Sequence, residues 1–325
     1  MKRNIAIVAG GDSAEFQISV QTAQHIQNTL DPEKYQTYLV YIRGLDWHVE
    51  LGETSYPIDR NDFSFTLEGN KIKFDFAYIA IHGTPGENGI LQGYFELLRI
   101  PHSTCNVLSS SLSFNKHACN TYLKSLGYRF AKSLLLKQKD QFHTNEIIDK
   151  LGLPCFVKPN ADGSSFGISK VKDMSELEPA IAKAFSEGRE VIIEEFIDGL
   201  EVTCGLVKTK HQELIFPVTE VIPKKEFFDF EAKYDPNMSE EITPARIPDE
   251  LTQRIQDLSS RIYDDLKCKG IVRIDYIIRK DEIYMLEANT IPGMTANSFI
   301  PKQVRAMNRE LRDILTMVIE NEFLN

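Results

Sequence analysis

A strand that is apolar at nearly every position is followed by a helical pattern near the start of the chain, and this order recurs. Residues 4–9 (NIAIVA) are typical of a buried strand, and residues 13–30 follow with helical spacing of apolar side chains. Two further strand patterns, YQTYLVYI at 35–42 and FAYIAIHG at 76–83, keep the same rhythm. Strands in a βαβ order favour a parallel sheet, so the sequence predicts an α/β fold that begins with one.

The rest of the chain is predicted to contain mostly strands, with a helix before them and two long helices among them. The predicted helices are 109–127, which carries Lys116, 249–267 and 301–321. The predicted strands are SLLLKQ at 133–138, LPCFVKP at 153–159, EVIIEEFI at 190–197, TCGLVKT at 203–209, ELIFPVTEV at 213–221, IVRIDYII at 271–278 and EIYMLEAN at 282–289. Boundaries are expected near 105 and 199, which gives domains 1–105, 106–198 and 199–325.

Composition excludes several classes of protein. The 325 residues suffice for two or three domains, and the net charge of −10 argues against a nucleic-acid partner. No apolar run approaches the roughly 20 residues of a membrane span, and the apolar stretch after the basic N-terminal tip is too short for a signal peptide. The five scattered cysteines form no C-x-x-C pair, which favours a reducing cytoplasm over disulfides or zinc.

Residues 221–248 are polar, contain several prolines and show little periodicity. So long a loop in a compact domain is usually a lid or a disordered segment. We expect a lid that orders when ligands bind.

The strand patterns at 271–278 and 282–289 put acidic side chains on one face of a hairpin. Arg273 and Asp275 lie on the face opposite the apolar residues, and Glu287 and Asn289 lie two apart in the next strand. Two carboxylates and an amide oxygen are ligands that suit Mg²⁺. An exposed polar face with a solvated salt bridge explains the same alternation about as well.

The metal hypothesis constrains the register of this hairpin. Directly opposed residues share a face, so Asp275 and Glu287 can be opposed only if paired numbers sum to an even value. A two-residue turn at 280–281 would instead oppose Asp275 to Leu286. The hypothesis therefore predicts an odd loop or a β-bulge.

A glycine-serine loop, ADGSSFG at 161–167, follows a strand that carries Lys158 near its end. The loop lacks the P-loop spacing, and a lysine in this place is by itself most often a solvated cap. Backbone N–H groups and a lysine together nevertheless make a phosphate cradle. Glu194 and Glu201 flank the end of another strand, where ordinary surface acids are the simpler explanation.

Four blocks in this order resemble the ATP-grasp superfamily and, within it, the D-alanine–D-alanine ligases. They are K-P-x-x-x-G-S-S-x-G, E-E-F-I-x-G-x-E, R-I-D and L-E-A-N-T-x-P-G-M-T. GGDSAEFQIS, IHGTPGENGILQG, FFDFEAKY and PGMTANSFIP also match, so the resemblance covers nearly the whole chain. It implies an ATP-grasp fold, in which an N-terminal domain precedes two α+β subdomains that grip ATP.

The resemblance implies which residues bind the nucleotide and metals. Lys116, Lys158, Ser165 and Lys233 would contact the phosphates, and Glu201 the ribose. Glu194 and the backbone of Glu195, Phe196 and Ile197 would hold the adenine. Asp275, Glu287 and Asn289 would bind two Mg²⁺ or Mn²⁺ ions.

The resemblance also implies which residues meet the two D-alanines. Glu15 would bind the ammonium group of the first, with His82 nearby, although His82 is nearly as well explained as a turn-stabilising side chain. Arg273 and the Gly293 backbone would stabilise the tetrahedral intermediate. Ser298 and the N–H of Phe299 would hold the second carboxylate, and Ser164, Tyr234 and Glu15 would pin the lid. Members of this family are typically dimeric, so we expect a homodimer.

The chain departs from the family pattern at four places: Gln17, Asn88, Glu195 and Phe299. None of them removes a proposed catalytic group. Three other functions stay open: a D-alanine–D-lactate or other D-amino-acid ligase, a nucleotide-binding module without turnover, and a dinucleotide oxidoreductase. The incomplete glycine pattern in VAGGDSAE makes the oxidoreductase remote.

Overall fold

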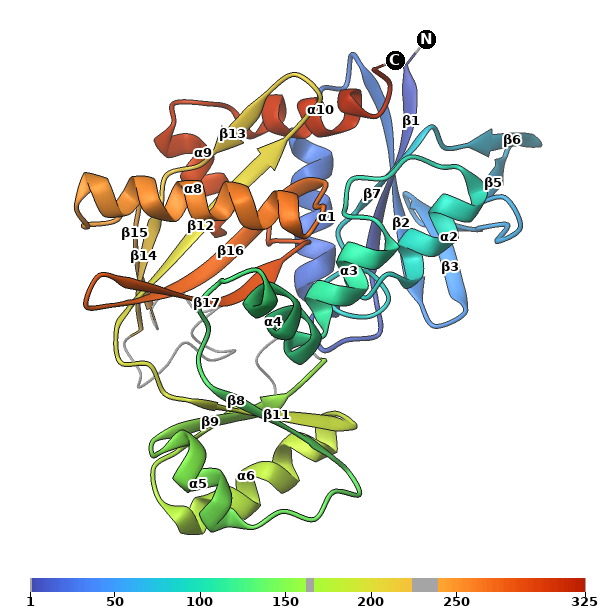
Figure 1. Ribbon diagram of the computed structural model, residues 1–325. Coiled ribbons are helices and arrows are strands. Elements are labelled where there is room, and N and C mark those ends of the chain that lie inside the picture. The colour runs from blue at the N-terminus through green and yellow to red at the C-terminus, as the bar shows by residue number, and fades with distance from the viewer. Residues whose placement is uncertain (1, 162–166, 224–238, 325) are drawn as a thin grey trace.

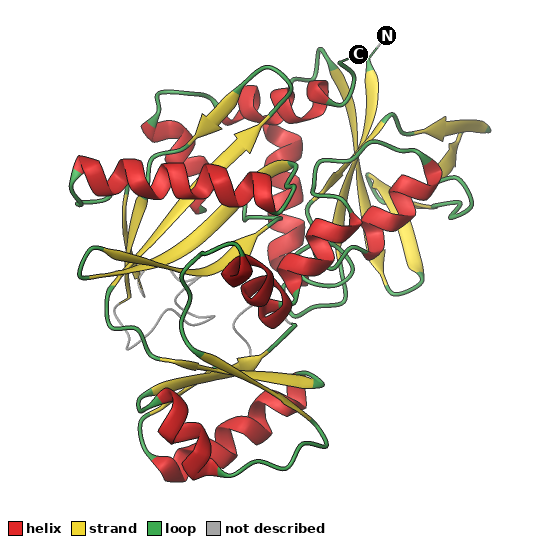
Figure 2. Cartoon of the chain, in the orientation of Figure 1, coloured by secondary structure: helices red, strands yellow, loops and turns green. Residues whose placement is uncertain are grey.

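The protein is described here by a computed structural model that covers residues 2–161, 167–223 and 239–324. Three larger sheets, a separate two-stranded sheet and the helices around them make up its three parts (Figures 1 and 2). Among the helices of these residues, none is both long enough and apolar enough to cross a membrane.

The first sheet has the strand order β4-β3-β2-β1-β7. Strand β1 pairs in parallel with β2 and β7, which confirms the parallel pairing expected from the βαβ rhythm. The antiparallel edge strands β3 and β4 and a separate hairpin, β5–β6, were not predicted. The strands are β1 (Arg3–Gly10), β2 (Tyr35–Arg43), β3 (Asp46–Leu51), β4 (Thr54–Pro57), β5 (Ser64–Leu67), β6 (Asn70–Lys73) and β7 (Phe76–Ile79), and the helices are α1 (Phe16–Thr29) and α2 (Ile90–Leu98).

The middle part of the chain folds around an antiparallel sheet with the order β10-β9-β11-β8. Among the described residues, its apolar core includes none outside 134–193. Both of its helices cover the sheet face turned away from the rest of the molecule (Figure 2). The elements are β8 (Ser133–Lys137), α5 (Thr144–Leu151), β9 (Cys155–Pro159), β10 (Ser169–Val171), α6 (Met174–Glu187) and β11 (Glu190–Glu195).

The third sheet has the order β15-β14-β12-β16-β17, with β13 paired to β12. One core cluster joins its Val207 and Phe216 to Ile5 and Phe76 of the first sheet, so these two parts share a core. The elements are β12 (Leu200–Lys208), β13 (Glu213–Ile215), β14 (Thr219–Pro223), β15 (Ser239–Ile242), α8 (Asp249–Asp265), β16 (Gly270–Arg279), β17 (Glu282–Asn289), α9 (Phe299–Ala306) and α10 (Leu311–Asn321).

Two helices predicted as continuous are each divided in the structure. The expected helix at 109–127 is α3 (Val107–Phe114) followed by α4 (Lys116–Ser125), because Asn115 is extended and caps the Ala118 N–H with its side chain. The expected helix at 301–321 is divided into α9 and α10, and Asn308 between them has a left-handed φ of 55°. Asparagine interrupts helices readily because its side chain bonds to nearby backbone.

The segment 221–248 was predicted as a loop throughout, and this is wrong for residues 221–223 and 239–242. Residues 221–223 belong to β14, and 239–242 form β15, which pairs antiparallel with β14. Residues 224–238 lie outside the described part of the chain. The expectation that they order as a lid stays a prediction.

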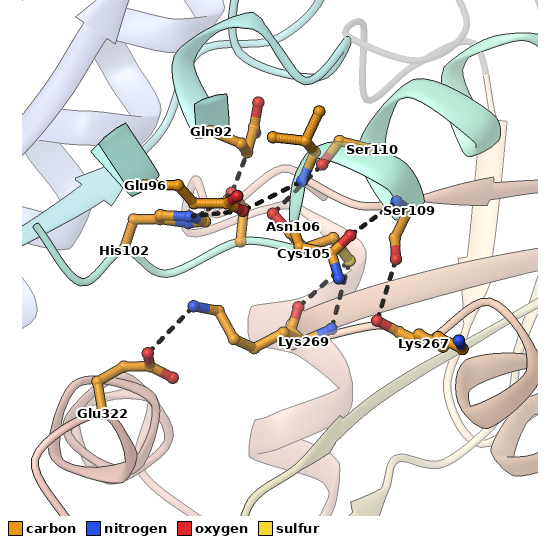
Figure 3. Close-up of polar contacts among 12 residues, drawn as sticks. Gln92, Glu96, His102, Cys105, Asn106, Ser109, Ser110, Lys267, Lys269 and Glu322 are labelled. Atoms are coloured by element: carbon orange, nitrogen blue, oxygen red, sulfur yellow. Dashed lines mark hydrogen bonds and ion pairs between the residues drawn. The ribbon is translucent and has the colours of Figure 1, made fainter. Parts of the chain in front are cut away.

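A polar seam joins the end of the first part of the chain to the beginning of β16 (Figure 3). The Lys269 N–H donates to the Cys105 sulfur at 3.4 Å, and the Ser109 hydroxyl donates to the Lys267 carbonyl at 3.0 Å. Lys269 Nζ also reaches Glu322 Oε2 at 3.1 Å. Gly270 lies in this seam with a φ of +73°, and a Cβ built on it would lie 1.9 Å from the Ser103 carbonyl oxygen.

We predict that Gly270→Ala destabilises the protein much more than Gly44→Ala. Both glycines have a positive φ, but nothing lies within 4 Å of a Cβ at Gly44. Gly44→Ala should therefore cost only the backbone strain, about 1 kcal/mol. Gly270→Ala adds a backbone clash and should cost roughly 3 kcal/mol or more, measured by urea unfolding. Equal losses for the two variants would contradict the close packing of the seam.

Candidate active site

The β16–β17 hairpin combines a two-residue turn with a β-bulge. Arg279 opposes Glu282 across Lys280 and Asp281, which both have a positive φ. The register then shifts between Asp275 and Tyr276, so that Leu286 is the extra residue and Asp275 opposes Glu287. The predicted bulge is confirmed. It keeps Glu287 and Asp275 on one face while Ile274 and Tyr276 stay in the core.

Asp275 is the centre of a hydrogen-bonded cluster on this face. Arg273 donates to both of its oxygens, through Nε to Oδ1 at 2.9 Å and through Nη2 to Oδ2 at 2.8 Å. Thr203 Oγ1 on β12 donates to Oδ1 at 2.5 Å, and Asn289 Nδ2 donates to Oδ2 at 3.0 Å. The side chains of Arg273 and Asp275 are each only 12% exposed, so this ion pair is largely desolvated.

The predicted metal ligands, Asp275, Glu287 and Asn289, lie on adjacent strands of this hairpin. Among the described residues, no three His, Cys, Asp or Glu side chains form a group that could hold a metal. The predicted set has only two side chains of these types, the carboxylates of Asp275 and Glu287, which are opposed across the hairpin. Its third member is the amide of Asn289, which opposes Arg273. Hard oxygen ligands of this number fit Mg²⁺ that takes its remaining ligands from water and phosphate. The three side chains therefore fit Mg²⁺, provided that some of the groups now donating hydrogen bonds to Asp275 are displaced.

The segment after β17 brings Gly293 and Ser298 together. A Cβ on Gly293 would lie 3.0 Å from Ser298 Oγ, and Thr295 Oγ1 shares a hydrogen bond of 2.8 Å with that hydroxyl.

Ser298 precedes α9, whose first residue, Phe299, has its ring centroid 5.1 Å from the Arg273 guanidinium carbon. Buried Gln303 fixes α9 on β12 through the Gly205 N–H and the Thr203 carbonyl.

Across from this sheet, Lys158 on β9 and Glu194 on β11 form a buried ion pair. Lys158 Nζ lies 2.6 Å from Glu194 Oε2, and Asn120 of α4 donates to Glu194 Oε1 at 3.3 Å. Burial alone would lower the pKa of Lys158, but the charge and hydrogen bond of Glu194 outweigh it and the pKa is raised. Lys158 therefore keeps its positive charge at neutral pH.

Asn160 connects the middle part of the chain to the start of α4. Its side-chain Oδ1 accepts from the His117 N–H at 2.8 Å, and its carbonyl accepts from the Lys116 N–H at 3.0 Å. Its Nδ2 donates to Asn115 Oδ1 at 3.0 Å and to Glu190 Oε2 at 2.8 Å. Asn160 is fully buried. It thereby sets Lys116, on α4, beside the strand that carries Lys158.

Two backbone N–H groups of the strand end at 194–197 are engaged within the protein. The N–H of Glu195 donates to the Lys132 carbonyl at 3.0 Å, and that of Phe196 donates to the Pro154 carbonyl at 3.3 Å. The side chain of Glu195 accepts from the Lys132 N–H at 2.8 Å, so it closes a backbone contact. A purine base bound here would therefore meet the backbone carbonyls of Glu195 and Phe196, or the backbone of Ile197. Glu201 lies on β12 opposite Val221 and Ile277.

Glu15 and His82 lie together in the first part of the chain. His82 Nε2 is 3.4 Å from Thr22 Oγ1, and its ring hydrogen-bonds the Ile291 backbone. Burial lowers the pKa of His82, and the charge of Glu15 only partly opposes this shift. His82 is therefore neutral at neutral pH and touches the segment that leads to Gly293.

Glu87 is a site residue that the sequence analysis missed. Burial raises its pKa to about 7, the charges of Glu15 and Glu287 add to the shift, and the Gly83 N–H and Lys116 oppose it. Glu287 also contributes to the raised pKa of Lys158. Charges from all three parts of the chain thus act on one another, so the predicted residues converge on one region.

Thr203, Asn120 and Asn160 were also missed. Thr203 lies two residues after Glu201 on the same strand face, and this spacing could have indicated it. The two asparagines gave no comparable signal, because their contacts join separate elements. Ser164, Ser165, Lys233 and Tyr234 lie outside the described residues, and their roles stay predictions.

Comparison with family models gives two adjacent matches. One, described as D-ala D-ala ligase N-terminus, matches residues 4–105, and one described as D-ala D-ala ligase C-terminus matches residues 123–320.

Individual proteins agree with these matches. The chain is 55% identical over 325 residues to a D-alanine–D-alanine ligase of Bacteroides fragilis, covering 99% of this chain and 100% of that protein. The structure of the VanG D-Ala:D-Ser ligase from Enterococcus faecalis matches with a TM-score of 0.88 and 32% identity, over 98% of this chain and 99% of that one. A D-alanine–D-alanine ligase from Bacillus anthracis complexed with ATP matches with a TM-score of 0.79 and 29% identity, over 99% and 97%.

We predict that Glu87→Gln makes the protein more stable relative to the wild type as pH rises. A carboxyl whose pKa is raised from 4.5 to about 7 favours folding below its unfolded pKa, and that contribution is lost as pH rises through 7. Glutamine has no charge to bury. In thermal unfolding with EDTA, the Tm of Glu87→Gln minus the Tm of the wild type should increase between pH 5 and pH 8.5.

Glu53→Gln, at an exposed turn, is the matched control and should track the wild type across the range. A Glu87→Gln curve parallel to the wild-type curve would contradict the raised pKa.

Proposed function

This chain belongs to the D-alanine–D-alanine ligase family, and we propose that it joins two D-alanines with ATP to give D-alanyl-D-alanine, ADP and phosphate. The product is a precursor for peptidoglycan synthesis. The observation that carries this proposal is the 55% identity over the full length of a D-alanine–D-alanine ligase. The ATP-grasp fold and use of ATP accord with the match to a relative complexed with ATP.

The reaction must first activate a carboxylate, which is a poor electrophile. A carboxylate oxygen of the first D-alanine attacks the γ-phosphorus of ATP, and ADP leaves. The amine of the second D-alanine then attacks the acyl carbon, loses a proton, and expels phosphate. Positioning and charge neutralisation supply most of the catalysis in phosphoryl transfer.

The described residues supply cations on one side and an ordered polar face on the other. We assign Lys158 and Lys116 to the nucleotide phosphates, because Glu194 and Asn160 hold both near one another. Glu194 and the backbone at 195–197 would hold the adenine, and Glu201 the ribose. Phosphate oxygens would replace part of the contact that Lys158 makes with Glu194.

The substrates would lie between the first sheet and the end of β17. Buried Glu15 suits the ammonium group of the first D-alanine, and neutral His82 can donate or accept beside it. Arg273 and the Gly293 N–H suit the oxyanion that forms when the amine attacks. Ser298 and the Phe299 N–H, at the start of α9, suit the second carboxylate.

Asp275, Glu287 and Asn289 would hold Mg²⁺ or Mn²⁺, which when bound neutralises charge on the transferring phosphoryl group. The lid roles of Ser164, Tyr234 and Lys233, and that of Ser165 at the phosphates, belong to this proposal as well. So do the homodimer, the cytoplasmic location and the domain boundaries near 105 and 199.

The acceptor is the open part of substrate choice. The match to a D-Ala:D-Ser ligase makes D-serine a specific alternative, beside D-lactate. We propose D-alanine, in line with the higher identity to relatives of that name.

We predict that phosphate release from ATP requires D-alanine and that D-alanyl-D-alanine is the main product. A phosphate-release assay with D-alanine, L-alanine, D-serine and D-lactate, followed by product analysis, tests this. ATP hydrolysis that ignores D-alanine would favour the module without turnover. A mixed peptide or depsipeptide as main product would change the acceptor but not the fold.

We further predict that Glu287→Gln abolishes turnover while the protein stays folded. The substitution keeps size and removes the charge opposed to Asp275 across the bulged pair. Turnover should fall at least about 10²-fold, with an unchanged circular dichroism spectrum. Glu282→Gln, at the exposed turn of the same hairpin, is the control. Near-normal rates of Glu287→Gln in Mg²⁺ would refute the site assignment.

A further inference from the structure

The carboxylate of Asp275 accepts four hydrogen bonds from protein donors. Oδ1 accepts from Arg273 Nε and Thr203 Oγ1, and Oδ2 accepts from Arg273 Nη2 and Asn289 Nδ2. A carboxylate has about four lone-pair sites, so this one is saturated. A cation can bind Asp275 only if it displaces at least one donor.

The donors differ in how readily they can leave. Arg273 carries a positive charge that a divalent cation repels, and its long side chain can turn without moving β16. Thr203 is neutral, only 2% exposed, and fixed on β12, where it directly opposes Asp275. Its β-branched side chain has few alternative rotamers. Its hydrogen bond is therefore the contact best able to persist.

We propose that Arg273 and a divalent cation exchange at Asp275, while Thr203 stays bonded to Oδ1 and holds the carboxylate in place. Thr203 is then a positioning residue for the metal ligand, and Arg273 competes with the metal. This inference rests on the proposed function, in which Asp275 binds metal.

The exchange gives Arg273 two successive partners within one small region. Its guanidinium carbon already lies 5.1 Å from the ring of Phe299, at the start of α9 beside Ser298. A turn away from Asp275 leaves it next to the site proposed for the second substrate. Arg273 thus becomes available to a developing oxyanion only once Asp275 has bound its cation.

The proposal predicts effects of opposite sign for two substitutions. Bound Mn²⁺ is measured by the loss of the free-ion electron paramagnetic resonance signal, with the full-length protein at fixed ADP. Thr203→Val keeps the shape and removes the hydroxyl, and should weaken Mn²⁺ binding about 10- to 100-fold. Thr203→Ser restores the donor and should bind within about twofold of the wild type.

Arg273→Lys keeps the charge but loses the two-pronged contact with Asp275, and it should bind Mn²⁺ about tenfold more tightly. Its turnover should nevertheless fall. A merely structural role for either residue would not tighten metal binding. Wild-type affinity in Arg273→Lys, or equal affinities in Thr203→Val and Thr203→Ser, would overturn the exchange. If Thr203→Val does not fold, the Arg273→Lys titration alone decides.

Asp275→Asn separates this inference from the function on which it rests. Loss of Mn²⁺ binding in Asp275→Asn, together with wild-type affinity in Thr203→Val and Arg273→Lys, overturns only the exchange. Unchanged Mn²⁺ binding in Asp275→Asn overturns the metal assignment itself. Where all three variants fold, the exchange stands only if Asp275→Asn and Thr203→Val lose affinity and Arg273→Lys gains it.

Discussion

The bulge at Leu286 is the constraint on which the active-site face depends. The two-residue turn at 280–281 alone would pair Asp275 with Leu286 and place Glu287 on the same face as Ile274. A charged glutamate would then enter the apolar core that Ile274 and Tyr276 share, at a cost of several kcal/mol. The extra residue, Leu286, shifts the pairing by one position, so that Asp275 opposes Glu287. The same residue therefore protects the core and assembles the acidic face.

Charge balance is the second requirement of this site. Besides burial, the charges of Glu15 and Glu287, which come from different parts of the chain, raise the pKa of Glu87, and Glu287 also helps to raise that of Lys158. Buried carboxylates this close are unfavourable without cations. Lys116 and Lys158 supply part of the compensation, and the proposed metals would supply more. Burying acids in this way is a cost that ligand-bound states can relieve, which suits a site for phosphates and metal ions.

The middle part of the chain is joined to α4 by asparagine side chains. It has its own apolar core, so its position relative to α4 is fixed by contacts such as those of Asn160 and Asn120. Asn160 contacts two elements with both its donor and its acceptor atoms, and Asn120 donates from α4 to Glu194 on β11. Such joints are specific in direction, because each hydrogen bond needs a donor and an acceptor in the right place. They suit the role in nucleotide binding that is proposed for this part of the molecule.

The sequence alone determined the elements and the chemical types of the site residues. Alternation in IVRIDYII and EIYMLEAN predicted the acidic face, and parity predicted either an odd loop or a bulge, because both follow from the two-residue period of a strand. The division of helices at Asn115 and Asn308, the edge strands β3 and β4, and strand β15 were missed. These depend on side-chain caps and on neighbouring strands that a local pattern does not contain. Only the tertiary structure decided that Thr203 meets Asp275, that Asn160 meets Lys116, and that Glu87 lies within reach of Glu287's charge, because each contact joins residues whose distance in the sequence carries no information about their distance in space.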